Sequence, residues 1–541
     1  MLIDQFTIYI GLLAIIVIVC ASFRTSAIPV PLFLVLTGML ISLIPGFPHI
    51  RVHSEIVLDI FLPLLLYQAS AYVSWREFKK HMRPIVWLSI GHVVFITILV
   101  ATTMHYIIPG LSWPLAFVLG SVISPPDDVA IIAIAEKIHF PRRVLTVLTG
   151  EGLLNDATAL TLFRFSLAAI ALNHFSVFQA LGTLVCVLTG ETIFGLLVGN
   201  AMGQLRMRIH DPVLQILISF ITPFIAFIVP EKLGGSGVIS VVVAGIVIGT
   251  RYLERFQPDV RLAARAVWTT LGFSLQNILF LLVGLDLRFN VERISAIPMH
   301  TIIFYSVTVI VVVVVGRFLW IFPATYLPRF LFPILSKDNP VPPWQYPFII
   351  SWAGMRGGIS LAAALAVPIL PSFIDGVSPR DLIVFLVVIV IVFTLLVQGI
   401  TLPSMLKLLG MTEHGEQEKY KSHLLELNAR LEIVSNVLRW LLNYELAVKH
   451  DIKLHEEAKL RIREYKQLKK HLRARLKKHE DEDEHDLELE SQEALFLSQQ
   501  LIEIERNIVA QLWERNRIDH VIKTKLILQL DHREKQLFGS S

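Results

Sequence analysis

The sequence predicts an all-α polytopic membrane protein, because it is far more apolar than a soluble domain and its apolar runs are about 20 residues long. Of 541 residues, 54% are hydrophobic and only 17% are charged, and the mean hydropathy is +0.64. A run of about 20 apolar residues can span a bilayer as a helix. The runs predict about 13 transmembrane helices near residues 6–23, 28–45, 55–73, 84–108, 112–136, 144–172, 176–203, 213–230, 236–251, 265–286, 299–326, 346–370 and 381–407.

The charges divide the chain into two domains. Residues 411–541 contain 23 basic residues (Lys and Arg) and 25 acidic residues (Asp and Glu). The much longer segment 1–410 contains only 25 basic and 19 acidic residues. We therefore expect a transmembrane domain over residues 1–410 and a helical, charge-rich cytoplasmic tail over residues 411–541. The two cysteines, Cys20 and Cys186, lie in apolar runs, so no disulfide framework is indicated.

The basic residues predict the orientation of the chain in the membrane. Most of them fall in alternate loops, namely Arg24, Arg76, Lys79, Lys80, Arg83, Lys137, Arg142, Arg143, Arg206, Arg208, Arg251, Arg255, Arg261, Arg265, Arg329 and Lys337. The positive-inside rule then places the N-terminus outside and the tail in the cytoplasm. The compact chain is typical of a bacterial plasma-membrane protein, so we expect it in the bacterial inner membrane.

Two of the predicted helices are interrupted in mid-span. Pro125 and Pro126 remove two backbone donors from the fifth helix, and glycines flank Arg356 in the twelfth, between Gly354 and Gly358. Each helix is the fifth in a run of six, and the seventh helix between the two runs inverts the second. Two inverted six-helix repeats with two unwound crossing helices are typical of a secondary transporter with a site at the membrane midplane. Proline or glycine kinks without a ligand are the alternative.

Carboxylates gather beside the first interruption. Two short runs, Ser124–Asp128 and Gly150–Asp156, lie within the fifth and sixth apolar segments. They contain four carboxylates, namely Asp127, Asp128, Glu151 and Asp156. A charge at membrane depth costs roughly 3 kcal/mol even on the lenient insertion scale, so such residues mark ion paths and proton relays. We therefore expect an ion site here.

These runs resemble motifs of a known family. Gly150–Ala157 resembles the Gly-Glu-Ser-Leu-Leu-Asn-Asp-Ala signature of the sodium/proton exchangers in the monovalent cation:proton antiporter-1 family. Asp127–Ala130 is similar to that family's Thr-Asp-Pro-Val-Ala crossing motif. The resemblance continues over most of the membrane domain, through Leu233–Gly245, Phe280–Gly284, Arg317 and Gly354–Ser360.

The resemblance implies an antiporter that exchanges a monovalent cation for H⁺ in pH and sodium homeostasis, with Na⁺ as the first candidate and K⁺ or Li⁺ as alternatives. It also implies a homodimer, in which helices four to six and eleven to thirteen carry the ion in an elevator-like movement. The chain departs from the pattern at Pro126, where Thr is common, at Asp128, where Pro is common, and at Gly152, where Ser is usual. Two hydroxyl groups are thus missing and one carboxylate is added.

Asp156 is the central candidate for cation and proton binding. A carboxylate buried in a helix core can exchange a proton near neutral pH, and it can also hold a hard monovalent cation. Competition for one site then gives obligatory exchange. Asn155 is neutral, so the Asn-Asp pair favours electroneutral exchange of one cation for one proton. Asp127 and Asp128 are further cation- and proton-binding candidates, with the alternative that they only neutralise half-helix ends.

Three charged residues have expected structural roles. Arg317 stands alone in a valine-rich run and needs a buried partner, for which the resemblance indicates Glu151. Arg356 is expected to stabilise the broken twelfth helix by contacting the carbonyl groups that the break leaves free. Pro125 and Pro126 are expected to define the break in the fifth helix. Arg164, two turns beyond Asp156, either snorkels or pairs with a neighbouring helix.

Other chemistry has little support in the sequence. No Walker or GxGxxG loop is present, which argues against direct ATP-driven pumping, and no Cys/His cluster indicates zinc. We expect no cofactor and no nucleic-acid partner; the expected partners are monovalent cations, protons, membrane lipid and a second copy of the chain. A cation channel and an intramembrane aspartyl hydrolase using Asp127 and Asp156 are the alternatives.

The tail has an amphipathic pattern. Apolar residues at spacings of three and four predict a coiled-coil-like seam that packs within the tail or across a dimer, namely Leu424, Leu427, Leu431, Val434, Leu438 and Leu441. A basic run, Lys466–Lys478, is followed by an acidic run, Glu480–Asp486. Their junction is predicted to be a flexible, salt-sensitive linker or to fold back on itself. A third amphipathic run covers about 487–528. Regulation or oligomerisation is the expected role of the tail.

Overall fold

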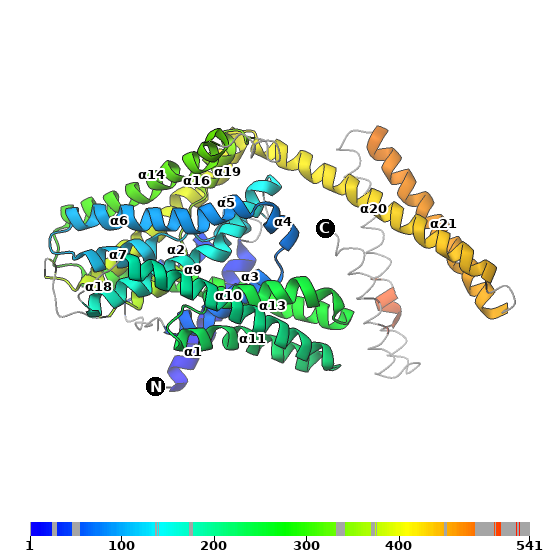
Figure 1. Ribbon diagram of the computed structural model, residues 1–541, viewed down its shortest axis with the longest axis horizontal. Coiled ribbons are helices and arrows are strands. Elements are labelled where there is room, and N and C mark those ends of the chain that lie inside the picture. The colour runs from blue at the N-terminus through cyan, green and yellow to red at the C-terminus, as the bar shows by residue number, and fades with distance from the viewer. Residues whose placement is uncertain are drawn as a thin grey trace. The chain divides into compact units, whose positions relative to one another are not determined.

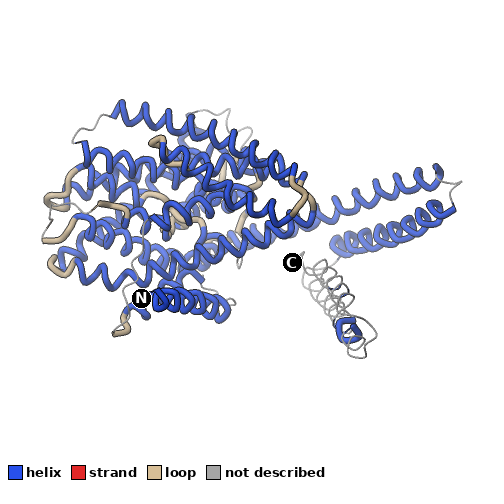
Figure 2. Tube along the Cα trace, turned by 90° about the horizontal axis from the view of Figure 1, so that it is seen from below, coloured by secondary structure: helices blue, strands red, loops and turns tan. Residues whose placement is uncertain are grey.

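The fold of the chain comes from a computed structural model (Figure 1). The structure describes residues 2–23, 30–45, 55–135, 138, 140–172, 177–331, 341–368, 374, 376–447, 452–481, 503, 505–509, 526 and 530. Figure 2 shows that these residues form helices and loops, which confirms the predicted all-α class. The described residues contain one isolated β-bridge, between Ile374 and Val377. The chain divides into two compact units, Met1–Glu416 and Gln417–Ser541.

One group of helices in the first unit packs around α13 (Pro258–Arg293). The other members of this α13 bundle are α1 (Leu2–Ser22), α2 (Val30–Ser42), η1 (Ile56–Phe61), α3 (Leu62–Ala71), α10 (Val177–Arg208), α11 (Pro212–Lys232), α12 (Val238–Val247), η3 (Ile248–Tyr252) and η4 (Leu253–Arg255). Helices α2 and α13 touch through their backbones. A Cβ atom on Gly38 would stand 2.9 Å from the Leu285 nitrogen, and one on Gly284 would stand 2.9 Å from the Met39 nitrogen. Small residues thus permit this contact.

A second group packs around α9 (Arg142–Leu172). The other members of this α9 bundle are α4 (Trp75–Lys80), α5 (Met82–Val86), η2 (Trp87–His92), α6 (Val93–Ile107), α7 (Trp113–Ile123), α8 (Val129–Ala135), α14 (Met299–Leu331), α16 (Gln345–Trp352), α17 (Gly358–Leu365), α18 (Pro379–Phe393), η5 (Thr394–Gln398) and α19 (Gly399–Leu408). The two bundles meet where α13 contacts α17 and α18, and where α9 contacts α3 and α12.

Several described helices are long and apolar enough to cross a membrane. Seven continuous spans meet this criterion, at Met82–Ile107, Arg142–Ile170, Val185–Arg208, Pro212–Lys232, Pro258–Arg293, Met299–Pro328 and Pro379–Leu408. Four shorter apolar helices accompany them, at Gly11–Ser22, Val30–Ser42, Ile56–Ala71 and Trp113–Ile123. A multi-pass membrane protein is therefore confirmed, whereas the count of thirteen spans and the inverted repeats stay predictions.

Some helices extend beyond the ranges predicted from the apolar runs. Helix α13 covers Pro258–Arg293 instead of 265–286. Pro258 at its first position and Asp259 in its first turn favour a helix start. These preferences do not depend on whether the start of the helix lies in lipid. The apolar run therefore defines the part of the helix that suits the membrane and not its full length.

The described part of the tail is a helical hairpin. Helices α20 (Met411–Ala447) and α21 (Ile452–Asp481) pack through two apolar clusters. The residues of these clusters are Leu427, Leu431, Val434, Val437, Leu438 and Leu441 on α20, with Ile462, Tyr465, Leu472 and Leu476 on α21. The seam thus packs within the tail. The basic run Lys466–Lys478 belongs to α21, whereas residues 482–486 of the acidic run lie outside the described residues, so both alternatives for the junction stay predictions. Most of the predicted run 487–528 lies outside the described residues.

Candidate ion-binding site

The first interrupted helix breaks at the paired prolines. Helix α7 ends at Ile123 and α8 begins at Val129, which leaves Ser124–Asp128 without regular structure. Proline has no N–H to donate and its ring clashes with the preceding turn, so two in succession end a helix. The break therefore lies where the sequence predicts it, and it frees the Ser124 and Pro126 carbonyl groups.

The second interrupted helix breaks at its glycines and meets the first. Helix α16 ends at Trp352 and α17 begins at Gly358. The backbone N–H of Asp127 donates to the carbonyl of Met355 at 2.7 Å. One hydrogen bond therefore joins the two irregular segments, and each satisfies a group that the other leaves free.

Arg356 ties the two breaks together a second time. Its side chain is fully buried, and Nη1 donates to the Ser124 carbonyl at the end of α7. Its backbone N–H donates to Thr394 Oγ1 at 3.1 Å. The side-chain hydrogen bond of Arg356 thus goes to a carbonyl of the first broken helix, and the expected stabilisation of the twelfth helix by this residue stays a prediction. Among the described residues, Nε and Nη2 of Arg356 have no hydrogen-bond partner.

A cavity of about 60 Å³ lies beside these breaks, at the interface of the two bundles. It has room for a few water molecules or a partly hydrated ion, since one water needs about 10–15 Å³ by this measure. Its walls are formed by Leu65, Leu66, Ala69, Pro125, Pro126, Asp127, Asp128, Gly152, Leu153, Asp156, Gln276, Gly357, Ile359 and Ser360. Three of the predicted ion-binding carboxylates thus share one small cavity.

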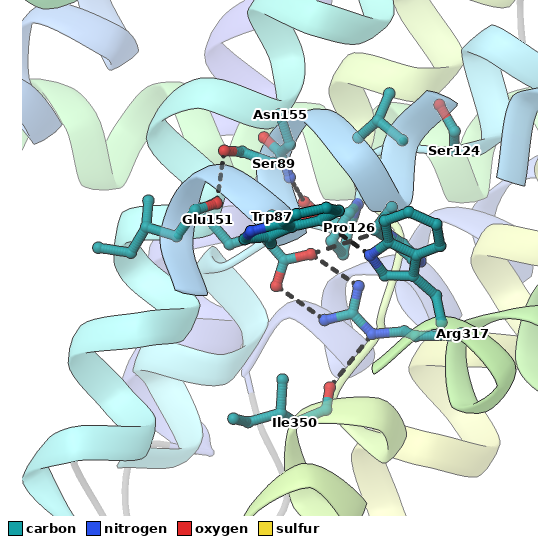
Figure 3. Close-up of polar contacts among 12 residues, drawn as sticks. Trp87, Ser89, Ser124, Pro126, Glu151, Asn155, Arg317 and Ile350 are labelled. Carbon is teal, nitrogen blue, oxygen red and sulfur yellow. Dashed lines mark hydrogen bonds and ion pairs between the residues drawn. The ribbon is translucent and has the colours of Figure 1, made fainter. Parts of the chain in front are cut away.

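Asn155 lies behind this cavity instead of lining it. Its amide Nδ2 donates to the Pro126 carbonyl at 2.6 Å (Figure 3). The Asn155 side chain is fully buried. Oδ1 has no partner among the described residues. Asn155 therefore satisfies a carbonyl that the proline break leaves free, and this contact fixes α9 against the interrupted helix.

The three cavity aspartates differ in their surroundings. The Asp127 carboxylate lies against Gly357 at the start of α17, where a side chain would overlap it. Asp128 lies over Gly152, and Asp156 is one turn further along α9. In the described part of the chain, neither Asp128 nor Asp156 forms an ion pair with a basic side chain. No group of three Asp, Glu, His or Cys side chains there is close enough to hold a metal ion.

Glu151 and Arg317 form a buried two-point ion pair. Arg317 Nη1 donates to Glu151 Oε1 at 2.8 Å and Nη2 donates to Oε2 at 2.9 Å (Figure 3). Arg317 Nε donates to the Ile350 carbonyl at 3.1 Å, which ties the pair to α16. His92 Nδ1 lies 3.7 Å from Glu151 Oε1, and both ring nitrogens lack a hydrogen-bond partner among the described residues. His92 was not identified from the sequence, although a single histidine in an apolar run could have indicated a buried polar contact.

Arg164 pairs across the interface of the two bundles. Its Nη2 lies 2.7 Å from Glu231 Oε1 on α11, and Nη1 donates to the Gly235 carbonyl. Of the two alternatives, Arg164 therefore pairs with a neighbouring helix. Glu231 was missed because a charge at the end of an apolar run is ordinary. Glu191 was also missed; its carboxylate accepts from the backbone N–H of Gly237 at 2.9 Å and caps the start of α12.

Comparisons with known proteins agree with this architecture. The family model described as the sodium/hydrogen exchanger, transmembrane, matches residues 11–408. An uncharacterised Na⁺/H⁺ exchanger of Mycobacterium tuberculosis is 33% identical over 517 residues, which cover 94% of this chain and 91% of that protein. A sodium, potassium, lithium and rubidium/H⁺ antiporter of Bacillus pumilus is 30% identical over 70% of this chain and 57% of its own length.

The fold also has a counterpart among solved structures. The sodium proton antiporter MjNhaP1 of Methanocaldococcus jannaschii superposes with a TM-score of 0.55, at 17% sequence identity, over 75% of this chain and 98% of that one. The family match covers most of the chain, and the site residues fall within it. This chain belongs to the sodium/hydrogen exchanger family, whose members are secondary transporters and not enzymes.

Proposed function

We propose that the protein is a secondary active antiporter that exchanges a monovalent cation for H⁺ across the membrane. Na⁺ is the first candidate, with K⁺ or Li⁺ as the alternatives. The observation that carries this proposal is the Asp156 carboxylate, which lines a small cavity between two helical bundles and has no basic partner among the described residues. The activities of relatives support it, because the Bacillus pumilus protein is an antiporter of sodium, potassium, lithium and rubidium.

Exchange follows from competition at Asp156. An uncompensated carboxylate at membrane depth is costly, so it favours either a proton or a cation as its counter-charge. A loaded carboxylate is neutral and can move with its bundle, whereas the empty charged site cannot. Each passage in one direction therefore requires a cation, and each return requires a proton.

One positive charge in each direction is the proposed stoichiometry. Asn155 next to Asp156 is neutral, and its amide is already used to hold the Pro126 carbonyl. Asp127 is proposed to bind the cation or proton only in a supporting role, since its carboxylate lies at the start of α17. The exchange is therefore proposed to be electroneutral.

An elevator movement is the proposed mechanism of alternating access. The α9 bundle carries Asp156 and both interrupted helices, and the ties at Met355 and Ser124 hold these segments together. The α13 bundle packs separately, through the α2–α13 backbone contact among others. The α9 bundle is thus proposed to move as one body past the α13 bundle, with the Glu151–Arg317 pair as a structural element inside it.

Several further properties complete the proposal. The protein is proposed to lie in the plasma membrane, the inner membrane in bacteria, as a homodimer with lipid around it. Its N-terminus lies outside and its tail in the cytoplasm, in accordance with the distribution of basic residues. Its role is pH and sodium homeostasis, and the tail regulates transport or holds the dimer.

Reconstituted protein tests the proposal against a channel. Dye-reported proton movement in proteoliposomes should follow addition of Na⁺, K⁺ or Li⁺ when no voltage is applied. A channel would instead conduct the cation alone, with a current and without obligatory proton movement. The hydrolase alternative is set aside because the family consists of transporters.

A further inference from the structure

Gly152 and Asp128 occupy complementary space. An ideal Cβ atom on Gly152 would stand 2.6 Å from Asp128 Cγ and 2.7 Å from Asp128 Oδ2. Such distances are far inside ordinary van der Waals contact, so the Asp128 carboxylate lies where a side chain at residue 152 would be. Any larger residue at 152 must displace this carboxylate.

The same contact directs Asp128 toward Asp156. Gly152 precedes Asp156 by four residues on α9, and residues at this spacing share one face of a helix. Both residues line the cavity of about 60 Å³, together with Asp128. Two carboxylates from different elements therefore face one small space.

The neighbouring Asp127 has different contacts from Asp128. Its backbone N–H donates to Met355, and its carboxylate lies against Gly357, where α17 begins. The start of a helix carries a partial positive charge and stabilises a carboxylate. Asp128 directly precedes the start of α8 at Val129, but its carboxylate lies over Gly152 and forms no ion pair with a basic side chain in the described part of the chain. Its carboxylate oxygen atoms are therefore available to a cation. Asp128 keeps the same charge when the site holds the cation and when it holds the proton, so the one-for-one exchange at Asp156 is unchanged.

We propose that Asp128 is a second carboxylate ligand of the transported cation, and that Gly152 is the residue that makes room for it and thereby sets cation selectivity. This inference rests on the proposed antiport. Hard cations prefer carboxylate oxygen, and a site with two carboxylates has a stronger field than a site with one. A stronger field favours the smaller Na⁺ and Li⁺ over K⁺, since the oxygen atoms approach a smaller ion more closely.

The experiment measures the KM for Na⁺, Li⁺ and K⁺ by dye-reported proton movement in proteoliposomes. The variants are Asp128→Asn, which removes the charge at nearly constant volume, and Gly152→Ala, which adds the displacing Cβ. Gly190→Ala is the matched control, because Gly190 is also a helical glycine and a Cβ there meets nothing within 4 Å. Asp156→Asn reports on the proposed antiport itself.

Both test variants should raise the KM for Na⁺ and Li⁺ by about tenfold or more, with a smaller change for K⁺. The double variant should be no worse than Asp128→Asn alone, because the two substitutions remove the same interaction. Gly190→Ala should stay within about twofold of wild type.

Wild-type KM values and cation ranking in Asp128→Asn, together with an inactive Asp156→Asn, would overturn this inference and leave the antiport proposal intact. If Asp128→Asn does not assemble, unchanged KM values in Gly152→Ala overturn it alone. No cation-dependent proton movement in the wild type would refute the proposed function instead.

Discussion

The backbone N–H of Asp127 donates to the backbone carbonyl of Met355 at 2.7 Å, which joins the two interrupted helices at their irregular segments. Unwinding a helix inside a membrane frees polar groups that lipid cannot satisfy. Here each break supplies a partner to the other, and Arg356 adds a hydrogen bond to the Ser124 carbonyl. The irregular backbone beside the cavity is thus held in one arrangement, which gives the cavity aspartates defined positions.

The Glu151–Arg317 pair should stabilise the fold more than any exposed pair. Removing one partner leaves a buried charge uncompensated, so Arg317→Met or Glu151→Met should each cost about 3–5 kcal/mol of unfolding free energy. The double variant with Met at both positions should be more stable than either single variant, because no unpaired charge is left. Thermal unfolding in detergent measures this order.

The exposed pair of Glu456 and Lys459, 3.2 Å apart on α21, provides the control for this measurement. Lys459→Ala should change stability by at most about 0.5 kcal/mol. Single variants of Glu151 and Arg317 that are as mild as this control would show that the buried pair is not a structural element.

Arg164 and Glu231 should separate during transport, because they lie on the α9 and α13 bundles respectively. Arg164→Cys and Glu231→Cys, joined by a cleavable bifunctional thiol reagent, should stop cation-dependent proton movement. Reductive cleavage of the linker should restore it. Cys20 and Cys186 would first be replaced by serine, since both are free thiols and Cys186 is exposed.

The single-cysteine variants treated with the same reagent control for modification alone. Unchanged exchange in the cross-linked double variant would mean that the two bundles need not move apart at this place, and the elevator mechanism would be wrong.

The tail should contribute to the dimer or to regulation. Removal of the residues after 412 deletes the α20–α21 hairpin almost completely. We expect a less stable dimer, measured as its dissociation on dilution in detergent, or a shifted pH dependence of exchange. A truncated protein with the dimer stability, ion affinity and pH dependence of the full chain would exclude both roles.

The breaks in the helices could be predicted from the sequence because their causes are local. Pro125 and Pro126 lack backbone donors, and the glycines around Arg356 disfavour a helix wherever they stand. The all-α class and the membrane location follow from apolar runs in the same way. Helix ends were less predictable, since α13 continues past its apolar run at both ends.

Contacts between distant segments could not be predicted in this way. The sequence indicates that Arg356 needs carbonyl partners, but only the packing of α7 against α17 and α18 decides that Ser124 supplies one. The residues Asp128 and Gly152 are visible separately as departures from the family pattern. Their shared space becomes apparent only when the break beside α8 is placed against α9.

The most direct test of the central claim is proton movement in proteoliposomes on addition of Na⁺, K⁺ or Li⁺, at several clamped voltages, for wild type and Asp156→Asn. We predict cation-dependent proton movement in the wild type that does not depend on voltage and is lost in Asp156→Asn. Proton movement that persists in Asp156→Asn, or that is absent from the wild type, would contradict exchange through this carboxylate.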